Sequence, residues 1–288
     1  SPSQYLVMTS TDIKAPDRIA DSKALFAGYG ELYVSNENIY WYENTSEHNG
    51  FSWEYSTLIR KISYKEGRLE AVAKGSVPGT IDDSFSIDEY EGNLRVVTTD
   101  ESANGLYILD PDLKEIGRLD NLAKGEQVYS ARLMGDTGYF VTFRNTDPLF
   151  SADLSDPENP QILGELKIPG FSEYLHPYGE GRLLGIGMDA DEETGGVKLS
   201  MFNVSDPADV KEEHTLILEN VYSADVLYDY RAALIDTDRN IIGFSAYKGA
   251  QEKYYLFSYD PDKGFTCLLE EQVNGSSQRA GRGLYIEN

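Results

Sequence analysis

The stretch Val128–Gly170 reads VYSARLMGDTGYFVTFRNTDPLFSADLSDPENPQILGELKIPG, and it decides the fold class. It contains four short apolar runs separated by turn residues. In the fourth run, one face carries Ile162, Gly164, Leu166 and Ile168, and the opposite face carries Glu165 and Lys167. Alternation with a period of two over runs this short predicts strands rather than helices. The stretch therefore predicts a four-stranded antiparallel meander.

The same unit recurs along the chain, and its clearest marker is an Asp-Pro pair after an apolar strand. The pairs begin at Asp110, Asp156, Asp206 and Asp260, at spacings of 46, 50 and 54 residues. Aspartate caps such a turn through its side chain, and proline presets φ for the second turn position. A period in the forties to fifties with four strands per unit predicts the blades of a β-propeller rather than a sandwich.

We predict one all-β domain over residues 1–288, a β-propeller of about six blades made of four-stranded antiparallel sheets. Five blades are complete and one is split between the chain ends, so that Arg282–Ile286 forms a strand; alternatively, the chain is a fragment of a larger propeller. Residues 44–54 are expected to be a polar insertion, and residues 189–196 an acidic one. The blades span about residues 30–79, 85–122, 128–168, 174–218, 224–273, and 4–26 together with 279–288.

The chain is strongly acidic, with a formal net charge of −24. Such a surface repels phosphate backbones, so we expect no nucleic-acid partner. No apolar run is long enough to span a bilayer, so we expect no membrane insertion by this segment, and the first residues lack a signal peptide. The one cysteine, Cys267, lies in an apolar run and is predicted to be a buried thiol.

Two adjacent carboxylates, Asp88 and Glu89, lie in the predicted first strand of the second blade. Alternation sends Asp88 and Tyr90 to one face and Glu89 to the other. Carboxylates beside a narrow channel could supply an acid–base pair. The alternative is that they accept hydrogen bonds from strand-end amides or pair with Arg95.

Other charged residues are candidates for the central funnel. Arg144 and Asp147 lie in a tight loop that ends in Pro148, where arginine could bind a carboxylate of a ligand or brace the loop. Arg132 and His176 lie on or beside predicted first strands. A single histidine is usually a hydrogen-bonded structural residue, and no three-ligand zinc pattern is present.

The acidic insertion is the one weak candidate for a metal. Asp189, Asp191 and Glu193 stand at alternate positions, as carboxylates do in calcium loops, but the glycine and the final glutamate of an EF-hand are missing. We therefore expect a flexible acidic loop, with calcium as the alternative, and no other cofactor. Nucleophile, phosphate-loop and dinucleotide motifs are absent.

Five segments carry a family resemblance: residues 83–99, 143–150, 175–178, 183–187 and 282–286. They resemble a secreted bacterial β-propeller family that is distantly related to WD40 repeats. The resemblance implies a propeller on an exported or surface-anchored bacterial protein, hence an extracellular or cell-surface location. It implies no established activity, so no catalytic residue is carried over.

The regular blades and the lack of a catalytic motif favour a non-catalytic binding or scaffold module for a protein or glycan ligand. The alternative is an extracellular enzyme that acts on polysaccharide or peptide through the charged residues at the funnel. Fold alone does not decide between the two, because propellers host both kinds of function.

Overall fold

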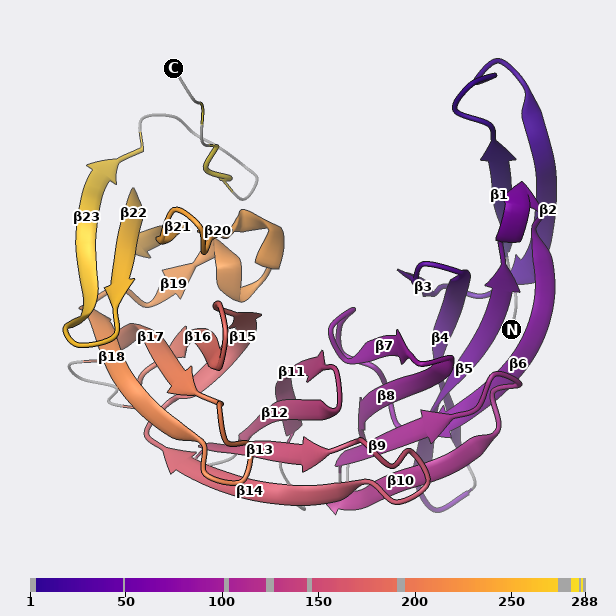
Figure 1. Ribbon diagram of the computed structural model, residues 1–288, viewed down its shortest axis with the longest axis horizontal. Helices are drawn as coiled ribbons and strands as arrows, with labels where there is room; N and C mark the ends of the chain where they lie inside the picture. Colours follow the sequence, from indigo (N-terminus) through magenta and orange to yellow (C-terminus); the bar gives the residue numbers. More distant parts are fainter. Residues whose placement is uncertain are drawn as a thin grey trace. The chain divides into compact units, whose positions relative to one another are not determined.

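The computed structural model describes residues 4–48, 50–100, 104–122, 127–143, 147–190, 195–273, 281–284 and 286. Within these ranges every regular element is a strand, apart from three 3₁₀ turns, Lys65–Gly67 (η1), Asp225–Leu227 (η2) and Tyr230–Ala232 (η3). In the part of the chain that is described, no helix has the length and apolar character needed to cross a membrane. The fold is all-β, with several four-stranded antiparallel sheets consistent with a β-propeller of about six blades (Figure 1).

The chain divides into two compact units. The first comprises residues 1–128, 133–136 and 153–161, and the second comprises residues 129–132, 137–152 and 162–288. The sheet of blade 3 contributes to both units; its order is β11-β12-β13-β14, with bounds Gln127–Met134, Thr137–Phe143, Asp147–Asp153 and Gln161–Ile168.

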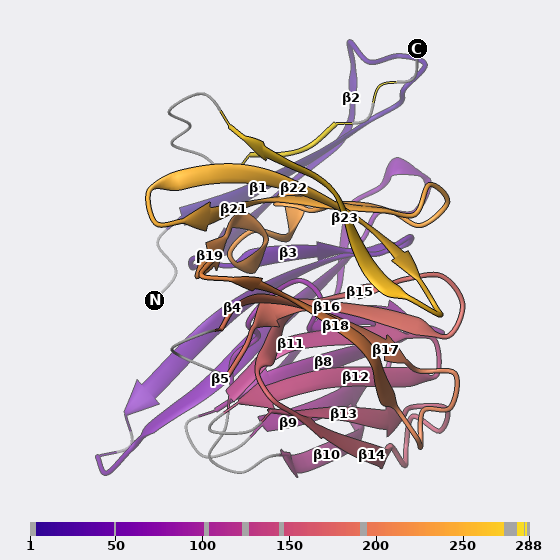
Figure 2. The same cartoon turned by 90° about the vertical axis from the view of Figure 1, so that its left-hand side faces the viewer.

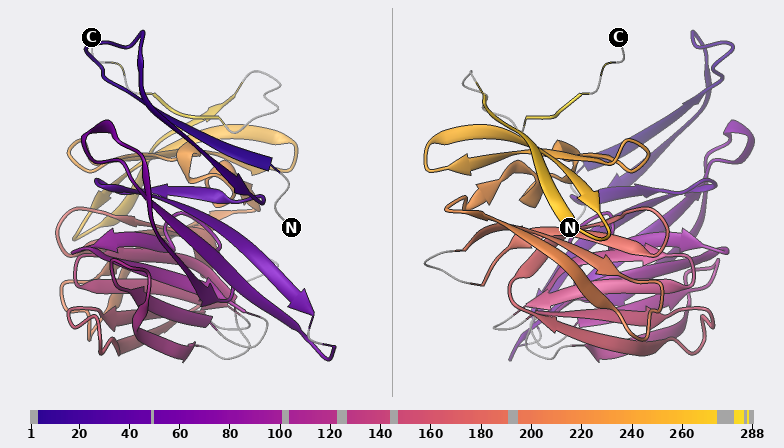
Figure 3. Two further views of the ribbon diagram at one scale, coloured as in Figure 1. Left: turned by 90° about the vertical axis from the view of Figure 1, so that its right-hand side faces the viewer. Right: turned by 60° about the vertical axis from the view of Figure 1, so that its left-hand side comes forward.

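Blade 1 is a meander in the first unit, in the order β3-β4-β5-β6. The expected polar insertion at residues 44–54 is not a separate loop, and that prediction was wrong. Cross-strand pairing continues out to His48 and Trp53, and Thr45 Oγ1 donates to the carbonyl of Ser56 over 3.0 Å. The resulting hairpin projects from its sheet (Figures 2 and 3). The strands are Glu31–Val34 (β3), Asn38–His48 (β4), Trp53–Ser63 (β5) and Glu70–Pro78 (β6).

Blade 2 packs against blade 1 within the same unit. Its sheet order is β10-β9-β8-β7, with bounds Glu115–Leu122, Asn104–Leu109, Asn93–Thr99 and Ile87–Tyr90. One apolar cluster joins the two sheets because both present large side chains on their facing sides. Its buried members are Tyr40, Tyr42, Ile59, Val77, Ile81, Ile87, Leu94, Val96, Tyr107, Leu109 and Leu113.

The N-terminal strands Gln4–Thr11 (β1) and Ile19–Ala27 (β2) form a two-stranded antiparallel sheet. Their inner side chains, including Leu6, Met8 and Leu25, pack onto Trp41 and Ile62 of blade 1. The predicted strand at residues 282–286 is not formed in the described residues 281–284 and 286, so that prediction was wrong there. Sharing of the last blade between the two ends stays a prediction.

Blade 4, in the second unit, follows the predicted four-strand order. Its strands are Phe171–Pro177 (β15), Arg182–Met188 (β16), Gly196–Asn203 (β17) and Lys211–Glu219 (β18).

Blade 5 departs from the repeat. Its first strand is interrupted by η2 and η3, so that both β19 and β20 pair with β21. Its strands are Ser223–Ala224 (β19), Leu234–Asp236 (β20), Ile241–Lys248 (β21), Gln251–Asp260 (β22) and Gly264–Gln272 (β23). The predicted burial of Cys267 was wrong, because β23 is the edge strand of its sheet and this residue is exposed.

The Asp-Pro turns form as predicted. In each of the four turns, Oδ1 of the aspartate accepts a hydrogen bond from the backbone N–H two residues later, over 2.9 to 3.1 Å. The turn of one blade also lies close to the outer strand of the blade before it. A Cβ atom on Gly117 would stand 2.1 Å from the carbonyl oxygen of Pro157, so glycine permits this approach.

Candidate functional site

Asp88 is paired with Arg95 rather than with Glu89. The two residues face each other on β7 and β8, and the bonds from Nε to Oδ1 and from Nη2 to Oδ2 measure 2.7 and 2.6 Å. The guanidinium also stacks 4.6 Å from the ring centre of Tyr90, so Asp88 and Tyr90 share a face as alternation predicts. Arg95 is only 2 % exposed. Asp88, whose side chain is 24% exposed, thus supplies the counter-charge of a buried guanidinium, and the bidentate pair joins β7 to β8.

Glu89 points to the other face of the sheet. Its carboxylate accepts hydrogen bonds from Ser35 Oγ and from Asn38 Nδ2, the latter over 2.8 Å. Its backbone N–H donates to the hydroxyl of Tyr33 over 3.1 Å. The two neighbouring carboxylates therefore do not form an acid–base pair, and Glu89 instead joins blade 2 to blade 1.

Arg132 and His176 lie together in the second unit. Arg132 Nε donates to the carbonyl of Leu175 over 2.9 Å, and its guanidinium lies 5.7 Å from the ring centre of Tyr174. The Tyr174 hydroxyl is 2.7 Å from His176 Nδ1. Burial, and to a smaller extent the charge of Arg132, lowers the pKa of His176 to about 4. The imidazole is therefore neutral at physiological pH.

Acidification is expected to destabilise the chain through His176. The pKa is 6.5 in the unfolded chain and about 4 in the folded one. The neutral ring therefore contributes its full stabilisation above pH 6.5, and this contribution is lost as the pH falls from 6.5 toward about 4. For a half-buried ring we expect a loss of roughly 2 kcal/mol.

Urea denaturation across this pH interval measures the effect, with a His176→Gln variant as the control. The variant is expected to lose less stability than the parent chain, because glutamine takes up no proton. Equal pH slopes for the two proteins would contradict the assignment.

The remaining predicted residues fall largely outside the described ranges. Arg144, Asp191 and Glu193 are not described, and for Asp147 only the backbone is, as the first residue of β13. The backbone N–H of Asp189 donates to the carbonyl of Gly196 over 2.9 Å. In the described part of the chain, no group of three or more histidine, cysteine or acidic residues could hold a metal ion.

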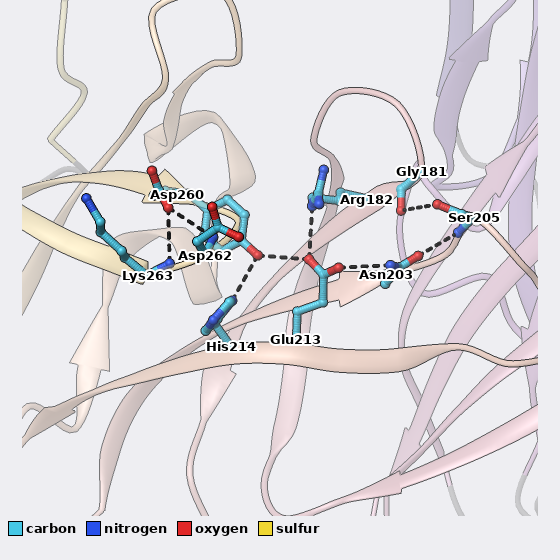
Figure 4. Close-up of polar contacts among 10 residues, drawn as sticks. Gly181, Arg182, Asn203, Ser205, Glu213, His214, Asp260, Asp262 and Lys263 are labelled. Atoms are coloured by element: carbon cyan, nitrogen blue, oxygen red, sulfur yellow. Dashed lines mark hydrogen bonds and ion pairs between the residues drawn. The ribbon is translucent and has the colours of Figure 1, made fainter.

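The second unit contains a polar network that sequence reasoning missed (Figure 4). Glu213 accepts hydrogen bonds from Arg182 Nε over 2.9 Å, Asn203 Nδ2 over 2.8 Å and the Tyr259 hydroxyl over 2.9 Å. His214 Nδ1 lies 3.1 Å from the same hydroxyl. Burial and Glu213 raise the pKa of Tyr259 to about 12.

This network ties blade 4 to blade 5, because Glu213 lies on β18 and Tyr259 on β22. An adjacent cavity measures about 200 Å³, and two of its lining residues are joined by a 2.7 Å hydrogen bond from the Tyr178 hydroxyl to Asn240 Oδ1. One sequence signal could have indicated this network. The outer strand of blade 4 has Glu213 and His214 at the positions where the outer strand of blade 3 has Leu163 and Gly164. We infer that the network stabilises the contact between blades 4 and 5.

A cavity of about 580 Å³ lies beside the β4–β5 hairpin. Trp53 on its wall is 53 % exposed and stands edge-on to His48, with ring centres 5.1 Å apart. Phe51, at the hairpin tip, is fully exposed. The described lining residues are Glu47, Ser52, Trp53, Glu54, Tyr55, Ser56, Ser76, Val77, Pro78 and Asp100. Six of these ten residues are polar or acidic, and Trp53 and Tyr55 add two aromatic rings. The volume lies in the range of ligand sites.

A smaller cavity of about 240 Å³ lies on the same sheet and is lined by Tyr29, Gly30, Glu31, Tyr42 and Asn44. The Tyr42 hydroxyl donates to Glu31 Oε2 over 3.0 Å. Burial, with Asp83 and Glu31 nearby, raises the pKa of Asp82 beside this region. Three carboxylates, Glu31, Asp82 and Asp83, thus lie in or beside this cavity.

Two archaeal proteins are similar to the chain in sequence. An uncharacterized protein of Archaeoglobus fulgidus is 42% identical over 258 residues, and one of Methanocaldococcus jannaschii is 42% identical over 256 residues. These alignments cover 89% and 86% of the chain but only 38% of each relative. The chain thus spans less than two fifths of the length of these curated relatives. Because both are archaeal, they give no support to the bacterial origin implied by the resemblance.

Solved structures share the fold at low sequence identity. A putative 6-phosphogluconolactonase from Bacteroides uniformis matches with a TM-score of 0.56 and 12% identity, over 93% of this chain and 82% of that one. A chain from a study of two prolyl endopeptidases matches with a TM-score of 0.51 and 13% identity, over 90% and 38%. Identity this low shows the fold alone. The model of the beta propeller domain family matches residues 1–288 in full, and the chain belongs to that family.

Proposed function

We propose that this propeller is a non-catalytic binding module and that its ligand occupies the cavity beside the β4–β5 hairpin. The observation that carries the proposal is the aromatic wall of a cavity of about 580 Å³, with the indole of Trp53 half exposed. Exposed aromatic side chains supply much of the binding energy at protein interfaces and stack on sugar and peptide groups.

A catalytic role is the weaker candidate. The described carboxylates and bases singled out from the sequence are bound to neighbours within their own unit: Asp88 to Arg95, Glu89 to Asn38, and His176 to Tyr174. A general acid or base needs a substrate within hydrogen-bonding reach, and these groups already have partners. The enzymes with a similar fold share only 12–13% of their residues with this chain.

A protein or glycan partner and an extracellular or cell-surface location are part of the proposal. They rest on the family resemblance and on the exposed hairpin, which a partner could reach (Figure 3). Protease treatment of intact cells that express the protein tests the location. Cleavage of the hairpin without lysis is expected, and protection until lysis would contradict it.

Replacing Trp53 with alanine is expected to weaken ligand binding at least tenfold, about 1.4 kcal/mol, because an aromatic anchor is lost. Glycan and peptide libraries are screened with the purified chain, and the affinity of each ligand found is measured by calorimetry. Intrinsic fluorescence follows the site when the signal of the Trp53→Ala variant, which retains the buried Trp41, is subtracted; these are the two tryptophans of the chain.

The matched control is Tyr228→Ala, which removes another exposed aromatic ring, 82 % accessible, far from the hairpin in sequence. It is expected to leave the affinity unchanged. A ligand that binds Trp53→Ala as tightly as the parent chain would place its site elsewhere and overturn the proposal.

A further inference from the structure

Every charged side chain among the described residues that line the two cavities of blade 1 is a carboxylate. Glu47, Glu54 and Asp100 line the larger cavity and Glu31 lines the smaller one. The chain has 25 lysines and arginines, yet none is among these lining residues. Arginine does occur further along β5, where Arg60 is bound to Glu43. The charge at the cavities is therefore one-sided.

Aromatic rings accompany these carboxylates in both cavities. Trp53 and Tyr55 line the larger one, and Tyr29, which is 83 % exposed, lines the smaller one. An ammonium or guanidinium group is attracted to the face of an aromatic ring, and tryptophan is the strongest acceptor. The carboxylates that line the same cavity can each form a charge-assisted hydrogen bond to such a cation. Rings and carboxylates together select positive charge.

The crowding of carboxylates beside the smaller cavity points the same way. Asp82 is adjacent to Asp83 and close to Glu31, and like charges at short range disfavour ionisation of one another. A bound cation would relieve this repulsion, whereas a phosphate or sulfate group would increase it. Both cavities involve β4, at Tyr42 and Asn44 for one and at Glu47 for the other.

We propose that the partner recognised here is a cationic peptide segment, whose lysine or arginine side chains enter the carboxylate-lined and aromatic-lined cavities of blade 1. This inference rests on the proposed function, because it names the ligand class of that same site. The net charge of −24 assists by attracting a basic partner at long range. The local carboxylates and Trp53 then decide where the segment binds.

A tetra-arginine peptide tests the inference, with tetra-citrulline as its uncharged isostere and a neutral tetrasaccharide as the third probe. Binding is followed through Trp53 fluorescence of the full chain at low salt and at physiological salt. The arginine peptide is expected to change the fluorescence and to bind at least tenfold more tightly than the citrulline peptide. Salt is expected to weaken this binding without abolishing it, because the cavity partly shields the ion pairs from screening.

The variant Glu47→Gln/Glu54→Gln keeps the shape of both side chains and is expected to weaken arginine-peptide binding at least fivefold. The control Glu37→Gln/Glu70→Gln removes the same net charge at exposed positions that line neither cavity, and it is expected to change the affinity less than twofold. Equal losses in the two variants would show attraction by the whole surface and overturn the inference.

The probes also separate this inference from the proposed function. If the tetrasaccharide changes Trp53 fluorescence and the arginine peptide does not, the ligand class is wrong while the cavity remains the binding site. If no probe changes the fluorescence, the cationic ligand is likewise rejected. The proposed site itself fails only when a ligand found by screening binds independently of Trp53.

Discussion

Replacing Asp88 with alanine is expected to lower the free energy of unfolding by about 3–5 kcal/mol, because a buried guanidinium then loses its counter-charge. Arg95 is 2 % exposed, and Asp88 holds two of its nitrogens at 2.7 and 2.6 Å. The remaining contacts, to the carbonyl of Gly135 and to the Tyr90 ring, carry no full negative charge. Urea denaturation at neutral pH measures the loss.

Two further variants make this expectation specific. Asp88→Ala/Arg95→Met removes both charges and is expected to recover much of the lost stability, because no unpaired charge then remains buried. Asp209→Ala breaks an exposed ion pair, in which the Asp209 side chain is 62% and the Lys211 side chain 67% accessible. This loss is expected to cost less than about 1 kcal/mol of stability. If Asp88→Ala lowers the free energy of unfolding by no more than Asp209→Ala does, the stabilising role of the Asp88–Arg95 pair is refuted.

Gly117→Ala is expected to destabilise the first unit by about 3 kcal/mol, at the upper end of the cost of overpacking. The added Cβ would stand 2.1 Å from the carbonyl oxygen of Pro157, which is far inside van der Waals contact. That oxygen belongs to an Asp-Pro turn whose backbone is held by Asp156, so the turn resists displacement. Differential scanning calorimetry and urea denaturation are suitable measurements.

The matched control is Gly164→Ala, on the outer strand of the next blade. There the nearest atom to the added Cβ would be the carbonyl oxygen of Ala208 at 3.2 Å, and a shift of a few tenths of an ångström removes the conflict. We expect a loss below about 1 kcal/mol, because small adjustments of this kind are cheap. If both variants lose the same stability, the close approach at Gly117 is not what requires glycine.

Local signals predicted most of the strands correctly. The Asp-Pro turns form with the side-chain caps that their residues predict, since this chemistry acts over two or three residues. Alternation also placed Asp88 and Tyr90 on one face and Glu89 on the other, because the pleat of a strand has a period of two.

The errors arose where more than one element decides the outcome. The polar stretch at residues 44–54 looked like an insertion, yet cross-strand pairs extend the strands through it. The interruption of the first strand of blade 5 by η2 and η3 had no distinct local signal. Cys267 lies in an apolar run, but it is exposed because its strand is at the edge of the sheet. Burial depends on what packs against a strand, and composition does not report that.

For the candidate site too, the sequence predicted the local properties and the tertiary structure decided the contacts. The sequence alone determined the acidic charge, the repeat of four-stranded sheets and the face of each strand residue, because charge, turn chemistry and pleat are local properties. Only the tertiary structure decided that Glu89 binds Asn38 of another blade, that Glu213 gathers Arg182, Asn203 and Tyr259, and that Trp53 lines a cavity. These hydrogen bonds join residues that are 10 to 51 positions apart in the sequence, and a cavity exists only where separate strands leave space between them.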